Sequence, residues 1–415
     1  MHSPLQIAPL ILLLAPAAAG QTVLVVGQSD PQADFTEIQP AVDAAAEGDV
    51  ILVRSGSYDR FEVDGKSLTI AGDPGAFPIV ADFPPPGGAL IRVRDLAPDQ
   101  SVTLRRLFTE PNTIVAPAVA LDLQDNQGPV WVEDCLISMF NPLIQVSGDV
   151  HGLQARNSAS VVVVGSTCVG NRASQGLEAT DSAVFAFGST FEGGFGTFDA
   201  GLGVYVDGGH GARLDGGSLF ASGCSFQGGN GTSPFSPCTA VASGGGDGVL
   251  LAAGDPAFDH LDTVLAGGSG GIPTPFCPTA APGSSGSDLT VLSGTANALP
   301  GTAHGVAAAS PLRVGEVLDQ LFTGAPGELV FEVLAGGQTA ASFAPQFAGA
   351  LVLGQPQFVF FHGTLDGAGS LQQQDTIPPL APGVEGRPLY LLPVFLDPVS
   401  LALVLGAPTA VLLLE

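Results

Sequence analysis

The chain has 415 residues, and 39 acidic side chains against 12 basic ones give it a formal net charge of −27. Apolar residues make up 45% of the sequence, enough for a large buried core, and this excludes an intrinsically disordered chain. Lys66 is the only lysine, and only Arg313 and Arg387 follow Arg213 among the arginines. The basic stripe that phosphate binding requires is therefore missing, which excludes nucleic acid as a partner.

Residues 1–20 have the pattern of a secretory signal peptide. An apolar run, LQIAPLILLLAPAAA at 5–19, ends in small residues before Gly20 and Gln21. Proline interrupts this run, and it is shorter than the roughly 20 apolar residues of a transmembrane span. We therefore expect export, to the cell surface or beyond it, with no transmembrane span after signal removal. An uncleaved anchor is the alternative.

The five cysteines form no C-x-x-C pair and no His/Cys ligand spacing, so neither structural zinc nor thioredoxin-type chemistry is predicted. Exported proteins meet oxidising conditions, and one or two disulfides are expected. Cys238 and Cys277 lie in similar loops rich in Pro and Ser, and we take them as the best pair. The sequence itself leaves the connectivity open.

The segment 34–73 predicts one helix followed by short strands. Thr36 and Gln39 have capping-box spacing, and Gly48 is expected to end the helix. One apolar face lies between them, at Ile38, Ala41, Val42 and Ala45. We expect this helix to cover the open end of a stack of β-coils, where unpaired backbone would otherwise be exposed.

The middle of the chain repeats one short pattern. GSTCVG (165–170), GSTFEG (188–193) and GCSFQG (223–228) each contain a glycine, small residues, an apolar residue and a second glycine. A β-prone stretch precedes each copy, such as VVVV at 161–164. Copies more than 20 residues apart with variable insertions predict a solenoid, in which each coil buries its apolar face on its neighbours. An irregular β-sandwich is the alternative.

Longer apolar strands without this repeat follow, such as GELVFEVL at 327–334, and predict a small β-sandwich. We assign 21–305 to the solenoid and 306–415 to a C-terminal β-rich domain. I-P-P-L at 377–380 and G-R-P-L-Y at 386–390 resemble the C-terminal module of many exported proteins of environmental bacteria. That resemblance implies a cap on the solenoid, a surface-attachment device or a sorting signal, and we expect the cap.

Residues 34–73 resemble the opening of right-handed parallel β-helix proteins of the pectin-lyase-like superfamily. The matching elements are the I-Q-P-A-V helix, the G-D-V-I-L-V strand, the G-S-Y turn and the G-K-S-L-T-I strand. The resemblance implies an all-β fold, a right-handed parallel β-helix of roughly ten coils with a short N-terminal capping helix, in an exported bacterial protein. It says almost nothing about activity.

The superfamily includes polysaccharide-cleaving enzymes, so we compared their signatures with the chain. Asp259-His260 resembles the I-D-H element of pectate lyases, but no R-x-P-x-x-R follows. Gly209-His210-Gly211 matches the G-H-G of polygalacturonases without the N-T-D and D-D motifs. GGHGARLDG (208–216) departs from the calcium nonapeptide, because Arg213 occupies the position of a ligand Asp. We therefore predict no cofactor and no metal site, and Ca²⁺ binding has no supporting motif.

One local cluster combines carboxylates, histidine and arginine more densely than any other: Asp199, Tyr205, Asp207, His210, Arg213 and Asp215. If coils bring them to one face, Asp207, His210, Arg213 and Asp215 are the candidates for acid/base catalysis and carboxylate binding. Turn carboxylates that accept backbone N–H groups are the structural alternative.

The aromatic content argues against a sugar-processing enzyme, since one Trp and three Tyr stand against 24 Phe, which lack the polar edge that sugars commonly contact. We expect a non-catalytic extracellular or cell-surface protein that has a structural role or binds a polysaccharide or another envelope component. A polysaccharide lyase or glycoside hydrolase acting on an extracellular glycan is the alternative hypothesis.

Overall fold

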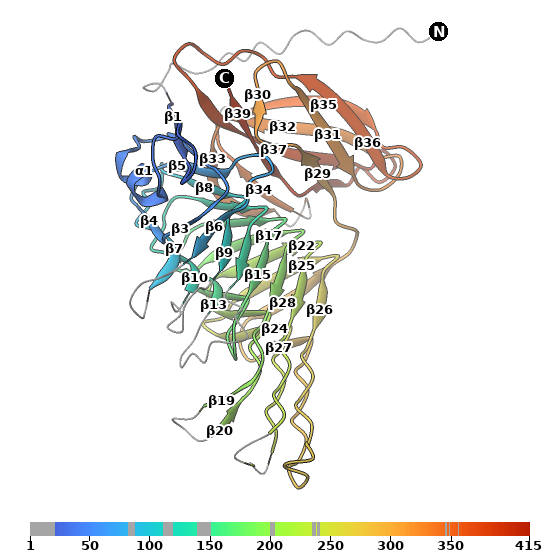
Figure 1. Ribbon diagram of the computed structural model, residues 1–415. Coiled ribbons are helices and arrows are strands. Elements are labelled where there is room, and N and C mark those ends of the chain that lie inside the picture. The colour runs from blue at the N-terminus through green and yellow to red at the C-terminus, as the bar shows by residue number, and fades with distance from the viewer. Residues whose placement is uncertain are drawn as a thin grey trace.

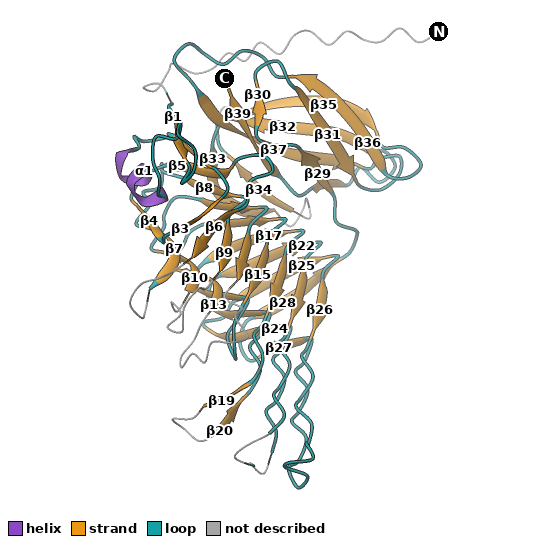
Figure 2. Cartoon of the chain, in the orientation of Figure 1, coloured by secondary structure: helices purple, strands orange, loops and turns teal. Residues whose placement is uncertain are grey.

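The computed structural model describes residues 21–415 except 82–87, 111–118, 139–150, 200–203, 235–237, 239–240, 345–346, 348 and 356. The expected signal peptide at 1–20 lies outside the described residues. Nearly all of the regular structure is β (Figure 2). A long solenoid carries a second β domain at its side, and extended loops of the later coils project away from that domain (Figure 1).

Three parallel sheets, which we call A, B and C, run along the solenoid, and each complete coil adds one strand to each sheet in that order. Sheet A has ten strands: β1 (Val23–Val26), β2 (Val50–Val53), β5 (Leu68–Gly72), β8 (Val102–Arg105), β11 (Val130–Glu133), β14 (Val161–Val164), β17 (Ala183–Phe187), β22 (Ser218–Ser222), β25 (Ala257–Leu261) and β28 (Thr295–Leu299). The predicted right-handed parallel β-helix is confirmed.

Sheets B and C have eight strands each. Sheet B contains β3 (Gly56–Tyr58), β6 (Pro78–Ala81), β9 (Phe108–Glu110), β12 (Leu136–Ser138), β15 (Thr167–Val169), β18 (Thr190–Glu192), β23 (Ser225–Gln227) and β26 (Val264–Ala266). Sheet C contains β4 (Phe61–Asp64), β7 (Ala89–Arg94), β10 (Val119–Gln124), β13 (His151–Arg156), β16 (Leu177–Thr180), β21 (Ala212–Asp215), β24 (Val249–Ala253) and β27 (Leu289–Val291).

The repeated sequence pattern forms the corner between sheets A and B. Its first glycine takes a positive φ, 54° at Gly188, where other residues are strained. The next residue is buried and bonds the carbonyl two positions back, as Ser189 Oγ does to Phe187 O at 3.0 Å. The apolar position then points inward, where Phe191 and Phe226 stack with ring centroids 4.9 Å apart.

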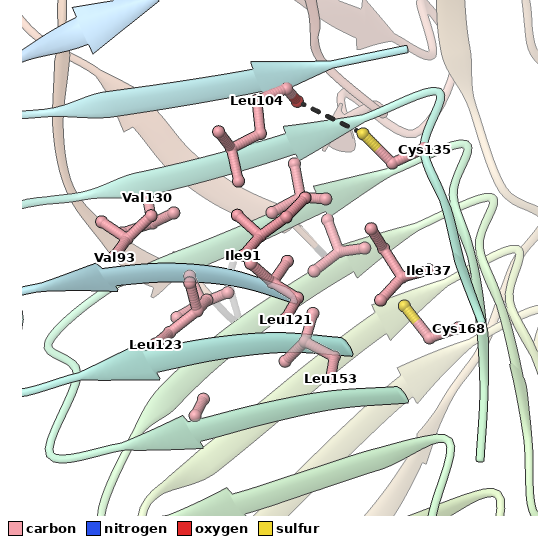
Figure 3. Close-up of a cluster of buried hydrophobic side chains, with 14 of the residues drawn as sticks. Ile91, Val93, Leu104, Leu121, Leu123, Val130, Cys135, Ile137, Leu153 and Cys168 are labelled. Carbon is pink, nitrogen blue, oxygen red and sulfur yellow. Dashed lines mark hydrogen bonds between the residues drawn. The ribbon is translucent and has the colours of Figure 1, made fainter. Parts of the chain in front are cut away.

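Apolar side chains from all three sheets fill the interior (Figure 3). Ile91, Leu121 and Leu153 follow one another in register along sheet C and are fully buried. Cys135 and Cys168 lie in the same core as unpaired thiols. The solenoid therefore has one continuous core to which every coil contributes.

Helix α1 (Ile38–Ala44) covers the N-terminal end of the solenoid with Ile38 and Ala41 fully buried. Its predicted caps are wrong: the N-cap is Glu37 without a side-chain hydrogen bond, and Gly48 lies beyond the helix end. Lys66 Nζ instead donates to Val42 O at 2.9 Å and Ala45 O at 2.7 Å. A lysine from the next coil thus satisfies carbonyls that a glycine was expected to cap.

The C-terminal domain is largely antiparallel. One sheet contains β29 (Gly305–Ala308), β31 (Val317–Thr323) and β36 (Ser370–Thr376). The other orders β30 (Leu312–Arg313), β39 (Thr409–Leu414), β37 (Gly386–Leu396), β32 (Leu329–Ala335) and β35 (Gln357–Thr364), with β38 (Leu403–Leu405) beside β37. Strands β33 (Gln338–Ala344) and β34 (Gly349–Leu353) form a separate pair.

This domain packs along the outer face of sheet A instead of closing the solenoid's end, so the expected capping position is wrong. Trp131 lies 5.2 Å from Tyr390 and Phe220 lies 5.0 Å from Phe343, measured between ring centroids. Val162 and Phe187 are buried in the same contact. The strands of sheet A from β2 to β22 are thus buried on both faces, which explains their continuous apolar sequences.

Three glycine-rich connections between sheets B and C, at 193–211, 228–248 and 267–288, stack on one another beyond the sheets (Figure 1). The hydrogen bonds between these connections repeat every three residues. Gly193 N donates to Gln227 O, and Gly196 N donates to Asn230 O in the next connection. Gly194 N points to the opposite neighbour and donates to Ser174 O. Three residues per turn is the period of the polyproline-II conformation. A β-carbon on Gly209 or Gly229 would collide with neighbouring backbone. Most glycines in these connections therefore permit close packing.

Candidate functional site

The structure places Asp207 and His210 on the outer side of the returning glycine segment 207–211. An oxygen of Asp207 accepts from Gly244 N at 2.5 Å, and His210 Nδ1 accepts from Asp247 N at 3.0 Å. Burial lowers the pKa of His210, which favours the neutral ring that such an acceptor requires. The G-G-H-G motif is thus part of the glycine stack, and these two side chains bind the backbone of the next loop.

Asp199 and Tyr205 belong to a hairpin, β19 (Thr197–Asp199) and β20 (Val204–Val206), in the first of these loops. Tyr205 packs against Phe198 with ring centroids 5.0 Å apart. The hairpin precedes the returning segment, so Tyr205 lies in the projecting part of the loop.

Arg213 and Asp215 lie on the outer face of sheet C and pair with each other, Nε to Oδ2 at 2.8 Å. Of the four candidate residues, the structure therefore joins two as an ion pair and binds the other two to loop backbone. Their catalytic assignment stays a prediction, and the hydrogen bonds give each one a structural role.

Arg213 is one step of a longer charged row that sequence reasoning missed. Sheet C aligns Glu62, Arg92, Asp122, Gln154, Glu178 and Arg213 in register on its outer face. Asp122 is 1% exposed, and its carboxylate accepts hydrogen bonds from Arg92 Nε at 3.0 Å and from Arg156 Nη2 at 2.8 Å. In the sequence, this row is indicated by an alternation of apolar and polar residues that occurs once per coil, as in FEVD (61–64), IRVR (91–94) and LDLQ (121–124).

Asp259 and His260, which resembled a pectate-lyase element, lie in strand β25. The His260 ring stacks on the core residue Phe258 with centroids 4.9 Å apart, and burial lowers its pKa. Asp259 accepts from Asn297 Nδ2 at 2.9 Å on the neighbouring strand. Asp259 thus joins successive coils, whereas His260 packs on a residue of its own strand.

A groove of about 370 Å³ lies where sheet B meets the glycine stack. Glu192, Gln227, Phe195 and Asn230 contribute side chains to its lining. Glu192 and Gln227 are paired in register on β18 and β23, and both project outward. Phe195 and Asn230 follow on the outgoing glycine segments, and the Phe195 side chain is 50% exposed.

Glu192 has no side-chain hydrogen bond or ion pair in the described part of the chain. Among the described residues that line the groove there is no lysine, no arginine and no second carboxylate. The groove therefore offers one carboxylate acceptor, two amides and one apolar ring. This set can bind hydroxyl groups and pack on a sugar ring.

The described residues contain no group of three His, Cys, Asp or Glu side chains placed to hold a metal ion. No helix in the described ranges is long and apolar enough to cross a membrane. The expected pairing of Cys238 with Cys277 is confirmed, and this disulfide joins the second and third glycine-rich loops.

No family model matches the chain, and no curated protein sequence matches it. Among solved structures, the chain is similar to the deglycosylated pectin methylesterase from Aspergillus niger, with 12% identity and a TM-score of 0.27 over 63% of this chain and 90% of that one. It is also similar to tailspike protein 2 of Escherichia coli O157:H7 bacteriophage CAB120, with 11% identity and a TM-score of 0.29 over 90% of this chain and 65% of that one. At these values the similarity assigns no activity.

Proposed function

We propose that this chain is an exported, non-catalytic β-helix protein that binds an uncharged extracellular polysaccharide in the groove beside Glu192. The observation that carries the proposal is the combination of one hydrogen-bond-free carboxylate, the Gln227 amide and the half-exposed Phe195 ring in one groove. Sheet B is a regular surface whose rungs repeat, and it suits an extended polymer better than a small compact ligand.

The charge of the groove selects among glycans. Glu192 lies there without a lysine or arginine in the described lining, so a uronate polymer would meet repulsion and no cation. Hydroxyl groups of a neutral sugar can donate to the carboxylate, exchange hydrogen bonds with the Gln227 amide, and accept from Asn230 Nδ2. The Asn230 Oδ1 atom already accepts from Ser269 N and Ser269 Oγ. We therefore expect neutral glycans to bind more tightly than pectin-like ones.

The same composition argues for binding over cleavage. Glycoside hydrolysis uses two carboxylates that flank the bond, and Glu192 is the only acidic residue in the described lining. Asp122 and Asp215 of sheet C are engaged by arginines, and Glu178 of the same sheet is paired with His151. A general acid and a general base are therefore not paired in the groove.

Calorimetric titration of the secreted protein with neutral, amino-sugar and uronate oligosaccharides tests this proposal, with product assays for new reducing ends and for unsaturated uronates. We expect neutral oligosaccharides to bind, and we expect F195A and E192Q to weaken that binding about tenfold or more. F361A is the matched control, because Phe361 is 52% exposed on the C-terminal domain. Turnover of any glycan, or unchanged binding in both groove variants, would overturn the proposal.

A further inference from the structure

The last coil of the solenoid leaves an open end. Sheets A, B and C finish at β28, β26 and β27, and no further described strand pairs with these three edges. One inward column of sheet C makes the consequence visible: Val63, Val93, Leu123, Ala155, Ala179, Leu214 and Leu251 are all fully buried, and the next member, Val291, is 47% exposed. Leu292, the next residue, is 71% exposed.

The opposite end of the solenoid is closed. Helix α1 covers its core, and the outer edge of β1 is occupied by Asp34 and Phe35 N–H groups, which both donate to Val25 O. Side chains complete the protection, since Val25 N donates to Asp34 Oδ2 at 2.9 Å and Val23 N to Glu385 Oε2 at 3.0 Å. A second molecule therefore cannot add its open end to this closed end.

The open end also lacks the devices that protect exposed sheet edges. No Asp, Glu, Lys or Arg occurs from Leu289 to Leu312, although the chain as a whole has a net charge of −27. Edge strands are usually protected by charged side chains, above all lysine, or by proline within the strand. Strands β27 and β28 contain neither.

We propose that two copies of this chain dock through their open ends to form a two-fold dimer. The edges are self-complementary, since each offers unpaired N–H and C=O groups, and a two-fold axis pairs them as antiparallel strands. Between molecules of such negative charge, the absence of charged side chains from the last two strands reduces the repulsion that opposes contact. Because the other end is closed, the assembly stops at two copies and places two Glu192 grooves on one rod.

Sedimentation velocity and light scattering on the full secreted chain, from about 0.1 to 100 μM, test the dimer. We expect twice the monomer mass in the micromolar range. High salt should not weaken the dimer, because no ion pair is involved and salt screens the repulsion between the two negatively charged copies. L292K introduces a charge on a residue that is already 71% exposed, so folding should be kept, and the dimer Kd should rise at least about tenfold.

L401K is the matched control, since Leu401 is 72% exposed on the C-terminal domain. T295K tests the β28 edge independently and should also weaken the dimer. A monomer at every concentration, filaments of unlimited length, or equal effects of L292K and L401K would each overturn the inference. Glycan binding is measured separately, so its failure leaves the dimer test unaffected.

Discussion

The hydroxyl of Tyr390 lies 2.6 Å from Oγ1 of Thr103, although 287 residues separate them in the sequence. Gln338 Nε2 donates to both oxygens at 2.8 Å, so three side chains from β8, β33 and β37 form a closed triangle. Tyr390 and Thr103 are almost completely buried at this contact. The C-terminal domain is therefore held against sheet A by specific polar contacts as well as by apolar packing.

Removing one hydroxyl of this triangle should loosen the domain. Y390F and T103V should each lower the free energy of unfolding by about 1–2 kcal/mol, because each leaves a buried hydrogen-bonding partner unsatisfied. The double variant should lose less than the sum of the two, since the residues share one interaction. Urea denaturation measures all three, with T376V on the exposed strand β36 as the control. Strictly additive losses would contradict the triangle.

Burial raises the pKa of the Glu332 carboxyl, although His362, with Nε2 at 3.1 Å, and Gln320 act in the opposite direction. The folded protein then binds this proton more tightly than the unfolded chain does. The contribution of protonated Glu332 to the free energy of unfolding is largest below the unfolded-state pKa of about 4.3. This contribution falls as the pH rises through the folded-state pKa.

E332Q cannot ionise, so its free energy of unfolding should fall less steeply with pH than that of the wild type above about pH 4. Denaturation curves between pH 4 and 7.5 measure the difference. E192Q is the control, because it removes a carboxylate that is not fully buried. The difference between the two variants gives the effect of burial, apart from the effect of losing a charge. Parallel pH profiles for wild type and E332Q would show that burial of this carboxyl has no influence.

The repeat and the opening 40 residues predicted the fold because they encode local geometry. A corner such as Gly188-Ser189 needs a positive φ and a small hydrogen-bonding side chain, and both requirements are visible in the residue types. The docking of the C-terminal domain was not predictable in the same way. The run VVVV at 161–164 shows that both faces of β14 are buried, but it does not identify what covers the outer face.

The groove was missed for a related reason. Glu192 and Gln227 are 35 positions apart and become neighbours only when coils stack in register. His210 was singled out because charged residues surround it in the sequence, whereas its glycine neighbours determine its role. Many of the glycines around His210 form the stacked loops.

A single methyl group added to a glycine of the stacked loops should strongly destabilise them. Gly209 N donates to Gly194 O and its own carbonyl accepts from Gly229 N, both at 2.8 Å, while a β-carbon would collide with Ser174 O. G209A should destabilise the loop stack by about 1–3 kcal/mol and speed hydrogen exchange in 193–248, with the solenoid core unchanged. G367A, which has open space around its position, is the control. Equal exchange in both variants would contradict close packing.

The unpaired thiols should be inert in the folded protein. Burial raises the pKa of Cys135 and Cys224 to about 12 and also raises the pKa of Cys168. At pH 8 only about one in ten thousand of the Cys135 and Cys224 side chains is then in the thiolate form. Thiol titration should therefore find none in the native protein, three in denaturant, and all five after reduction of Cys238–Cys277. A thiol that reacts within minutes in native protein would be inconsistent with this burial.

The charged row of sheet C should contribute to stability and leave glycan binding unchanged. Asp122 is buried between Arg92 and Arg156, and D122N removes the negative charge while keeping the shape of the side chain. Two guanidinium groups would then face each other across a neutral amide, which should cost about 2 kcal/mol or more of unfolding free energy. R213A, at the half-exposed pair with Asp215, should cost less than about 1 kcal/mol. Thermal denaturation measures both, and calorimetry should show wild-type glycan affinity in the folded D122N protein. A selective loss of glycan affinity in D122N would indicate that the glycan binds on sheet C and not on sheet B.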